Sequence, residues 1–444
     1  MAQHISKTRI AAAVSAAVLG AGLSAPAGAV VVVGGDDGWE VSFDGNVNAF
    51  YTVGDFDAGY VTETADMDSS RVHSGFLPAF FSFNVKSPTV GGLTGTGRIS
   101  FAPTIQTGGA KTQFAAQANA TANINGINGA TIDTREVLAN LEGAFGEFSF
   151  GRTLSLFGRQ AILNDMTLFG VGFVPGGQQF GSVTFGRVGH GYTYPDFTAR
   201  FQYTTPNMNG LQIAIGLYDP ATIDNRGGLP VFTALAAGAA PNLGGLLDET
   251  DTPRFEGEVS YSTSFSGGNL KFWVDGLWQE IDSTCTGASN VLAAGVAVNC
   301  GGLTASAWGA GVKAGMRNFE FVGYFHDNEG LGLTAQFNAN AVAVDQNGNL
   351  IERKGSGYYV QGTYTFSGKT KVGVSYGEGN LDSAGGTALV GAGHVERSLW
   401  TVGVYHDVSS WLRLIAEFNH GEVAIDSSSG PEAQTFSVGG FLFW

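Results

Sequence analysis

The sequence predicts an all-β protein whose strands close into a transmembrane antiparallel barrel of about 16 strands. Three observations favour this class. Apolar and polar residues alternate in many short segments, and the connections between these segments are alternately short and long. The last segment, "QTFSVGGFLFW", ends on an aromatic residue. After residue 29 no apolar run reaches the roughly 18 residues of a membrane-spanning helix, so strands must make any crossing.

Each predicted strand has an apolar face and a polar or mixed face. Leu270, Phe272 and Val274, for example, alternate with a lysine, a tryptophan and an aspartate. Successive side chains of a strand point to opposite sides, so this period of two is typical of a strand with one face toward an apolar environment. The predicted strands are 39–53, 76–87, 94–106, 134–142, 146–152, 188–205, 210–217, 254–264, 269–280, 303–315, 319–327, 356–366, 369–378, 396–407, 411–422 and 434–444.

The connections distinguish a membrane barrel from a soluble sandwich. Short turns are expected at 89–92, 144–146, 207–210, 266–269, 316–318, 367–369 and 408–410. Long segments are expected at 54–75, 107–133, 153–187, 218–253, 281–302, 328–355, 379–395 and 423–433. Outer-membrane barrels have short periplasmic turns and longer external loops, whereas a sandwich has no reason to lengthen every second connection.

The stretch "TREVLANLEGAFGEFSFGR" shows which face meets lipid. Its two strands meet at Ala144-Phe145-Gly146, and we expect its apolar set, Val137, Ala139, Leu141, Phe148 and Phe150, to face outward. Arg135 and Arg152 have the same parity. Since an arginine at the bilayer midplane costs about 2–4 kcal/mol, either each lies beyond the apolar band or the register is broken there.

The first residues predict export. Lys7 and Arg9 precede an apolar run, and Ala27-Gly28-Ala29 has the small residues of a cleavage site. We therefore expect residues 1–29 to be a signal peptide and residues 30–444 to form one barrel domain. The formal charge of the whole chain is −16, with 38 acidic and 22 basic residues. Loss of Lys7 and Arg9 makes the mature chain more negative still, so a nucleic acid is not an expected partner.

Two cysteines are present, Cys285 and Cys300. Both fall in one predicted external loop of an exported chain, where oxidation is the default. We expect them to form a disulfide, with two free thiols as the alternative.

Motifs for catalysis or for binding a cofactor are missing from the sequence. The histidines show neither the HExxH spacing nor a Cys/His cluster, and there is no G-x-S-x-G elbow. The glycine-rich "GRVGHG" is not followed by a helical pattern, which argues against a phosphate cradle. We expect no enzymatic activity, no cofactor and no metal site.

The residues resemble the Gram-negative general-diffusion porins. The likeness is most specific in "TREVLANLEGAFGEFSFGR", which looks like the strand–turn–strand unit before the third loop of that family. "FGRVGHGYTY" and "FQYTTPNMNGLQIAIGLYDP" look like the strands that return from it. The resemblance implies a homotrimer in the outer-membrane lipid, with a third loop folded into each barrel. It also implies a water-filled channel for passive diffusion of small hydrophilic solutes and ions.

The resemblance further implies a pore constriction with basic wall residues facing acids on the third loop. Arg135 and Arg187 match the wall arginines, and Asp165 matches the first loop acid. The family's second loop acid has no counterpart here, because Asp165 is the only carboxylate between residues 153 and 186. Arg98 is a further candidate from the residues themselves, because Ile99 and Phe101 face lipid and put it inside.

Three alternatives remain open. Inward-facing aromatics such as Phe80, Trp273 and Tyr359 could form the binding slide of a substrate-specific channel for sugars or anions, or could pack under folded loops. The barrel could carry an enzyme site. It could also be a surface structural protein with a closed lumen.

Overall fold

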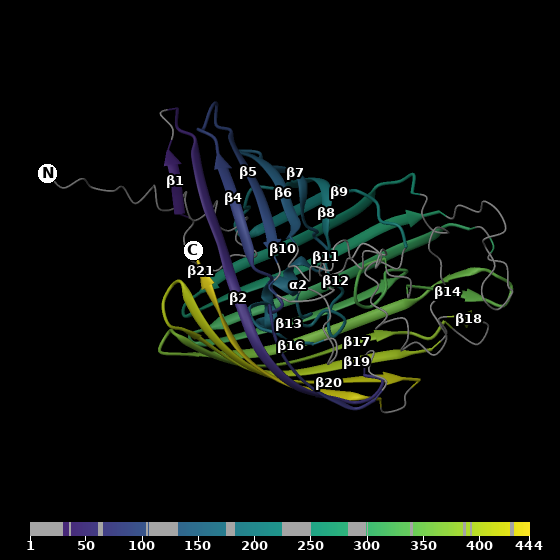
Figure 1. Ribbon diagram of the computed structural model, residues 1–444. Coiled ribbons are helices and arrows are strands. Elements are labelled where there is room, and N and C mark those ends of the chain that lie inside the picture. Colours follow the sequence, from purple (N-terminus) through teal and green to yellow (C-terminus); the bar gives the residue numbers. More distant parts are fainter. Residues whose placement is uncertain are drawn as a thin grey trace, which may run out of the picture.

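The strands form a closed, antiparallel 16-stranded barrel in the computed structural model (Figure 1). The structure describes residues 30–34, 37–60, 65–103, 105, 132–174, 183–223, 250–282, 299, 301–337, 341–384, 388–390, 393–426 and 430–444. The barrel strands are β2 (Glu40–Phe56), β4 (Phe80–Lys86), β5 (Thr94–Pro103), β6 (Ile132–Gly143), β7 (Gly146–Leu154), β8 (Phe197–Thr204), β9 (Leu211–Tyr218), β10 (Arg254–Phe265), β11 (Gly268–Ile281), β12 (Leu303–Met316), β13 (Phe319–Glu329), β16 (Lys354–Phe366), β17 (Thr370–Leu381), β19 (Val395–Asp407), β20 (Leu412–Ile425) and β21 (Glu432–Phe443). Every predicted strand has its counterpart in this set.

Five shorter strands accompany the barrel. β1 (Val30–Gly34) and β3 (Met67–His73) both pair with β2. β14 (Val342–Asp345), β15 (Leu350–Glu352) and β18 (Ala388–Val390) form a separate small sheet. All five lie outside the predicted strands, and four of them fall in segments predicted to be long loops.

The first and last barrel strands pair with each other and close the ring. β2 runs antiparallel to β21, from Asn46 opposite Phe443 to Phe56 opposite Ala433. Two backbone bonds between Gly45 and Trp444 continue this ladder, at 3.2 and 3.1 Å. The terminal Trp444 ring lies 5.7 Å from that of Phe43 and 5.1 Å from that of Phe81. The predicted closure is confirmed. The terminal aromatic is part of the junction between β2 and β21, which we call the seam.

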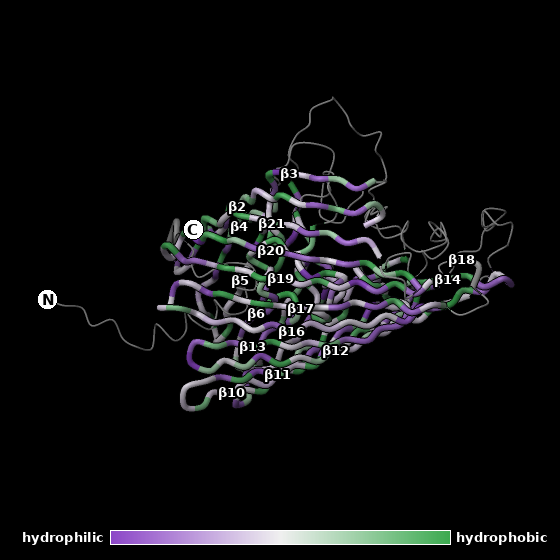
Figure 2. The backbone as a smooth tube through the Cα atoms, turned by 90° about the horizontal axis from the view of Figure 1, so that it is seen from below, coloured by the Kyte–Doolittle hydropathy of each residue, from purple (hydrophilic) through white to green (hydrophobic). Residues whose placement is uncertain are grey.

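The apolar face of the strands points outward. Val137, Leu141, Phe148 and Phe150 are between 37% and 45% exposed, as expected for side chains that meet lipid rather than a core. Alternation is visible along the strands in Figure 2, where hydrophobic and hydrophilic residues follow one another. Inward-facing neighbours such as Glu147 and Ser149 are buried. Among the described residues no helix has the length and apolar character needed to cross a membrane.

Short and long connections alternate around the barrel as predicted. Residues 144–145, 266–267 and 317–318 each join two strands with only two residues. Two of these turns contain a residue in the left-handed region, with φ of 84° at Gly267 and 55° at Arg317, as tight turns between antiparallel strands often do.

The predicted strand 188–205 begins only at Phe197, and this correction has a physical reason. Residues 188–196 alternate in hydropathy, yet they form turns and single bridges, such as Tyr194 with Ala335. Val188, Tyr192 and Tyr194 are all buried. A segment packed on both sides carries apolar residues at many positions, so the pattern alone resembles a strand.

A β-bulge decides the direction of Arg135. Ser100 pairs with Glu136 and the next residue, Phe101, pairs with Thr134, so Arg135 is left out of the ladder. A bulge of this kind adds one residue to one strand and redirects its side chain. Both Arg135 and Glu136 are buried on the inner face. Of the two readings left open for Arg135, the broken register is correct. Arg152 has regular pairing and stays exposed.

Two predictions fall on residues that the structure does not describe. The proposed signal peptide, residues 1–29, and both cysteines, Cys285 and Cys300, lie outside the described ranges. They remain predictions.

The seam generates a prediction for Gly45→Ala. A β-carbon at Gly45 would lie 2.2 Å from the Phe80 carbonyl oxygen and 2.6 Å from the Trp444 ring. We expect overpacking of about 1–3 kcal/mol, seen as a lower unfolding temperature of the purified protein. Gly362→Ala is the matched control, because no atom lies within 4 Å of a β-carbon there. Equal stability of the two variants would show that the seam tolerates the added atom.

Candidate functional site

The segment between β7 and β8 is bound to the inner face of the wall. Its backbone N–H groups donate to inward-facing side chains of three strands: Phe157 to Glu256 of β10 at 2.9 Å, Met166 to Gln361 of β16 at 2.8 Å, and Val171 to Glu417 of β20 at 2.7 Å. The outward neighbours on these strands, Phe255, Val360 and Phe418, are exposed. The segment therefore touches widely separated parts of the inner wall.

Two short helices shape this segment. α2 (Arg159–Asn164) follows Gly158, whose φ of 78° turns the chain sharply into the helix. The 3-10 helix η2 (Met166–Phe169) follows Asp165, whose carboxylate accepts bonds from the Thr167 N–H at 2.9 Å and hydroxyl at 2.7 Å. Capping by Asp165 thus satisfies a backbone donor that would otherwise be unpaired at a buried helix start.

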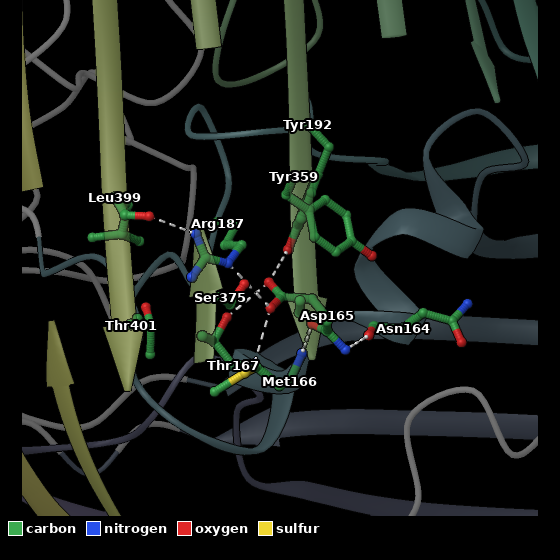
Figure 3. A network of polar contacts seen from close by, with 12 residues as sticks. Asn164, Asp165, Met166, Thr167, Arg187, Tyr192, Tyr359, Ser375, Leu399 and Thr401 are labelled. Carbon is green, nitrogen blue, oxygen red and sulfur yellow. Dashed lines mark hydrogen bonds and ion pairs between the residues drawn. The ribbon is translucent and has the colours of Figure 1, made fainter. Parts of the chain in front are cut away.

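Asp165 is also the centre of a buried polar network (Figure 3). Its carboxylate lies 3.8 Å from the Arg187 guanidinium and accepts a 2.8 Å bond from the Tyr192 hydroxyl. Arg187 in turn donates to the Leu399 carbonyl of β19 at 2.8 Å. The side chains of Asp165 and Arg187 have no exposed surface. The network ties both ends of the segment to each other and to the wall.

Burial sets the ionisation of this network. Burial and the neighbouring Asp165 carboxylate raise the pKa of Tyr192 well above its ordinary value, so its hydroxyl keeps the proton that it donates. Burial lowers the pKa of His190 to about 3, helped by the charges of Arg397 and Arg187. His190 is therefore neutral at physiological pH.

Arg135 is held beside this segment. Its guanidinium pairs with Asp133 at 3.0 Å, reaches the Tyr194 hydroxyl at 3.4 Å and lies 5.5 Å from the centre of the Phe197 ring. Only 5% of Arg135 is exposed. It contacts the residues through which the segment returns to β8.

A chamber of about 220 Å³ lies between α2 and the inner wall from β5 to β11. Its lining is dominated by charged and amide side chains. The charged members are Arg98, Glu136, Glu147, Arg159, Arg200, Glu258 and Lys271.

Arg98 marks one end of the chamber. It bonds Glu136 at 2.7 Å, Asp44 at 2.8 Å and Asn84 at 2.8 Å. Every one of these partners belongs to the wall of β2, β4 and β6. Two carboxylates therefore surround the Arg98 guanidinium, and these three side chains together carry an excess of one negative charge, although Asp44 is not itself a lining residue.

Arg159 and Lys271 mark the other end. Arg159, on α2, bonds Glu258 at 3.0 and 3.3 Å. Burial alone would lower the pKa of Arg159, but Glu258 offsets this and the pKa is raised. Lys271 donates to the neutral Gln160 at 2.7 Å rather than to a carboxylate. Arg159, Lys271 and Glu258 together therefore carry an excess of one positive charge, and the remaining charged lining residues, Glu147 and Arg200, have one charge of each sign.

The structure places the four predicted constriction residues in two settings. Arg98 lines the chamber, whereas Arg135, Arg187 and Asp165 are not among its lining residues. The structure does bring Arg187 and Asp165 together, but as a buried ion pair. The aromatics Trp273 and Tyr359 are buried too, and the Tyr359 hydroxyl donates to the Ala161 carbonyl of α2 at 2.8 Å.

Several chamber residues were missed by the sequence analysis. Glu258 and Lys271 have the inward parity of their strands, so the alternation could have found them. Arg159 has no such signal, because the chain between β7 and β8 has no strand period.

Comparison with known proteins places the chain in a family. A model of the family described as Gram-negative porin matches residues 11–424. No curated protein matches the chain.

Three solved structures illustrate the shared fold. The outer membrane channel DcaP of Acinetobacter baumannii is 11% identical, with a TM-score of 0.61 over 94% of this chain and 100% of that one. An anion-selective porin from Comamonas acidovorans is 12% identical, with a TM-score of 0.53 over 91% and 100%. Salmonella typhi OmpF, in a complex with daunomycin, is 11% identical, with a TM-score of 0.50 over 94% and 100%.

The family match spans nearly the whole barrel, and the closed ring of 16 strands agrees with it. The chain belongs to the Gram-negative porin family and is an outer-membrane channel for passive diffusion.

Proposed function

We propose that the chamber beside α2 is the constriction of the channel and that small hydrophilic solutes and ions diffuse through it. The observation that carries this proposal is the separation of charge along its lining. Arg98 bonds two carboxylates at one end, whereas at the other end Arg159 bonds one carboxylate and Lys271 bonds a neutral amide. Opposed charges in a narrow, low-dielectric passage create a field that orients water and polar solutes.

The segment between β7 and β8 acts as the constriction loop in this proposal. The loop itself supplies a cation, Arg159, where the resemblance implies an acid. Asp165, Arg187 and Arg135 have the role of holding the loop in place. An interior lined mainly by charged and amide groups suits a general passage for hydrophilic solutes better than a slide of aromatic rings. Trp273 and Tyr359 instead have packing roles under the loop.

We further propose that the barrel functions as a homotrimer and has no enzymatic activity. The trimer rests on the resemblance to general-diffusion porins. Mass measurement in mild detergent should give three chains per particle, and a stable monomer would exclude the assembly. Hydrolysis of model esters by the purified protein at a rate above that of a heat-unfolded sample would contradict the second point.

Arg159→Gln should shift ion preference toward cations. The substitution removes one positive charge and leaves Glu258 without its guanidinium partner. We expect the cation-to-anion permeability ratio to rise about fivefold, as a lost interaction of roughly 1 kcal/mol implies. The reversal potential of single channels in a KCl gradient measures it.

The matched control is Arg152→Gln, which removes the same charge from the exposed outer face. An equal shift in both variants, or no shift in either, would show that Arg159 does not line the conducting path.

Asp165→Asn should loosen the loop and leave ion preference nearly unchanged. The variant leaves Arg187 buried without a countercharge, and breaking a buried pair of this kind costs about 3–5 kcal/mol. We expect more frequent current fluctuations in single-channel recordings. Asp382→Asn, at an exposed ion pair with His394 outside this segment, is the control. A changed reversal potential with a quiet current would instead place Asp165 on the conducting path.

A further inference from the structure

A group of three lysines lies on the inner wall at the end of the barrel that carries the short connections. Lys271 of β11 lies three residues after the start of its strand, and Lys313 of β12 three residues before its end. Lys371 is the second residue of β17. In outer-membrane barrels the short connections are periplasmic, so this lysine group lies toward the periplasmic exit.

Two of these lysines directly oppose each other. Lys271 and Lys313 are register partners on adjacent antiparallel strands. Like charges at such positions destabilise a sheet. The opposition of these two positive charges is therefore unfavourable, and an anion close to them would offset it.

Two members of the lysine group lie beside one carboxylate. Glu320 lies 3.0 Å from the Lys313 ammonium and 4.0 Å from that of Lys371. Lys271 bonds the neutral Gln160, and the Glu258 carboxylate nearby is shared with Arg159. Lys313, Lys371 and Glu320 together leave an excess of one positive charge on this part of the wall, in addition to the Lys271 charge counted at the chamber.

Space for a ligand is present beside this charge. A hollow of about 510 Å³ has Lys371, Arg317, Glu320, Thr363, Asn269 and Asn318 among its lining residues, and Lys313 is joined to it through Glu320. The side chains of Lys313, Lys371 and Glu320 are 30%, 43% and 29% exposed, so the charges are open to solvent in the lumen. Ammonium groups with neighbouring hydroxyl and amide donors suit a phosphate-like oxyanion.

We propose that Lys271, Lys313 and Lys371 form a binding step for small phosphate-like oxyanions at the periplasmic exit. The proposal rests on the channel function proposed above and names a solute class that the exit favours. The step is weak, because Glu320 already offsets part of the charge and because conduction requires a solute to leave as well as enter. Anions that pass the constriction are thereby drawn onward to the exit.

The experiment uses the full-length channel in planar bilayers of a neutral phosphatidylcholine. Inorganic phosphate is added to a KCl solution on both sides, and the fall in chloride current gives a half-blocking concentration. We expect Lys313→Gln to raise that concentration about fivefold, and the Lys271→Gln, Lys313→Gln double variant to raise it further.

Lys369→Gln is the control. Lys369 lies exposed in the turn between β16 and β17, and the substitution removes the same charge. It should leave phosphate block unchanged. Absence of block in the unsubstituted channel would overturn the proposal, and so would identical block in all variants. If lipid headgroups fill the site, added phosphate will not block the chloride current, and this result also overturns the proposal. In each of these cases a persisting chloride current leaves the channel function intact, whereas loss of current in the unsubstituted protein would refute that function itself.

Discussion

The requirement that every backbone polar group be paired inside a bilayer governs this molecule. With no water in the hydrocarbon region, an unpaired N–H or C=O costs several kcal/mol, so a sheet in the membrane must have no edge. The pairing of β2 with β21 meets this requirement. Gly45 allows the chain end to approach closely enough to complete it, because any side chain there would meet Phe80 and Trp444.

Closure divides the side chains into two populations with opposite solvents. Outward positions carry Val, Leu and Phe, while inward positions carry charges and amides that need partners. The segment between β7 and β8 supplies many of those partners, since Glu256, Gln361 and Glu417 each accept a backbone N–H from it. The polar wall and the segment therefore stabilise each other, and the position of α2 follows from bonds made on three strands at once.

The distribution of charge in the lumen depends on how many oppositely charged partners each side chain has. Arg98 has two carboxylates within bonding distance, whereas Lys271 bonds an amide. The surplus at each end of the chamber arises from these unequal pairings. Asp165 and Arg187 differ from these residues because their pair is wholly buried. The pair stabilises the position of the segment and contributes little to the field that a solute experiences.

The sequence by itself determined the strands, their alternation of short and long connections, the closed barrel and the outward face. These features depend on the period-two alternation of apolar and polar residues and on the residues at turns. Both are local properties that can be read from residues close together in the sequence. Only the tertiary structure decided the site. Arg135 turns inward because of a bulge opposite Ser100 and Phe101, and residues 188–196 pack inside instead of extending β8. Arg159 meets Glu258 across a separation of 99 residues. No local pattern encodes such contacts, because they arise when the closed barrel brings distant strands around one segment.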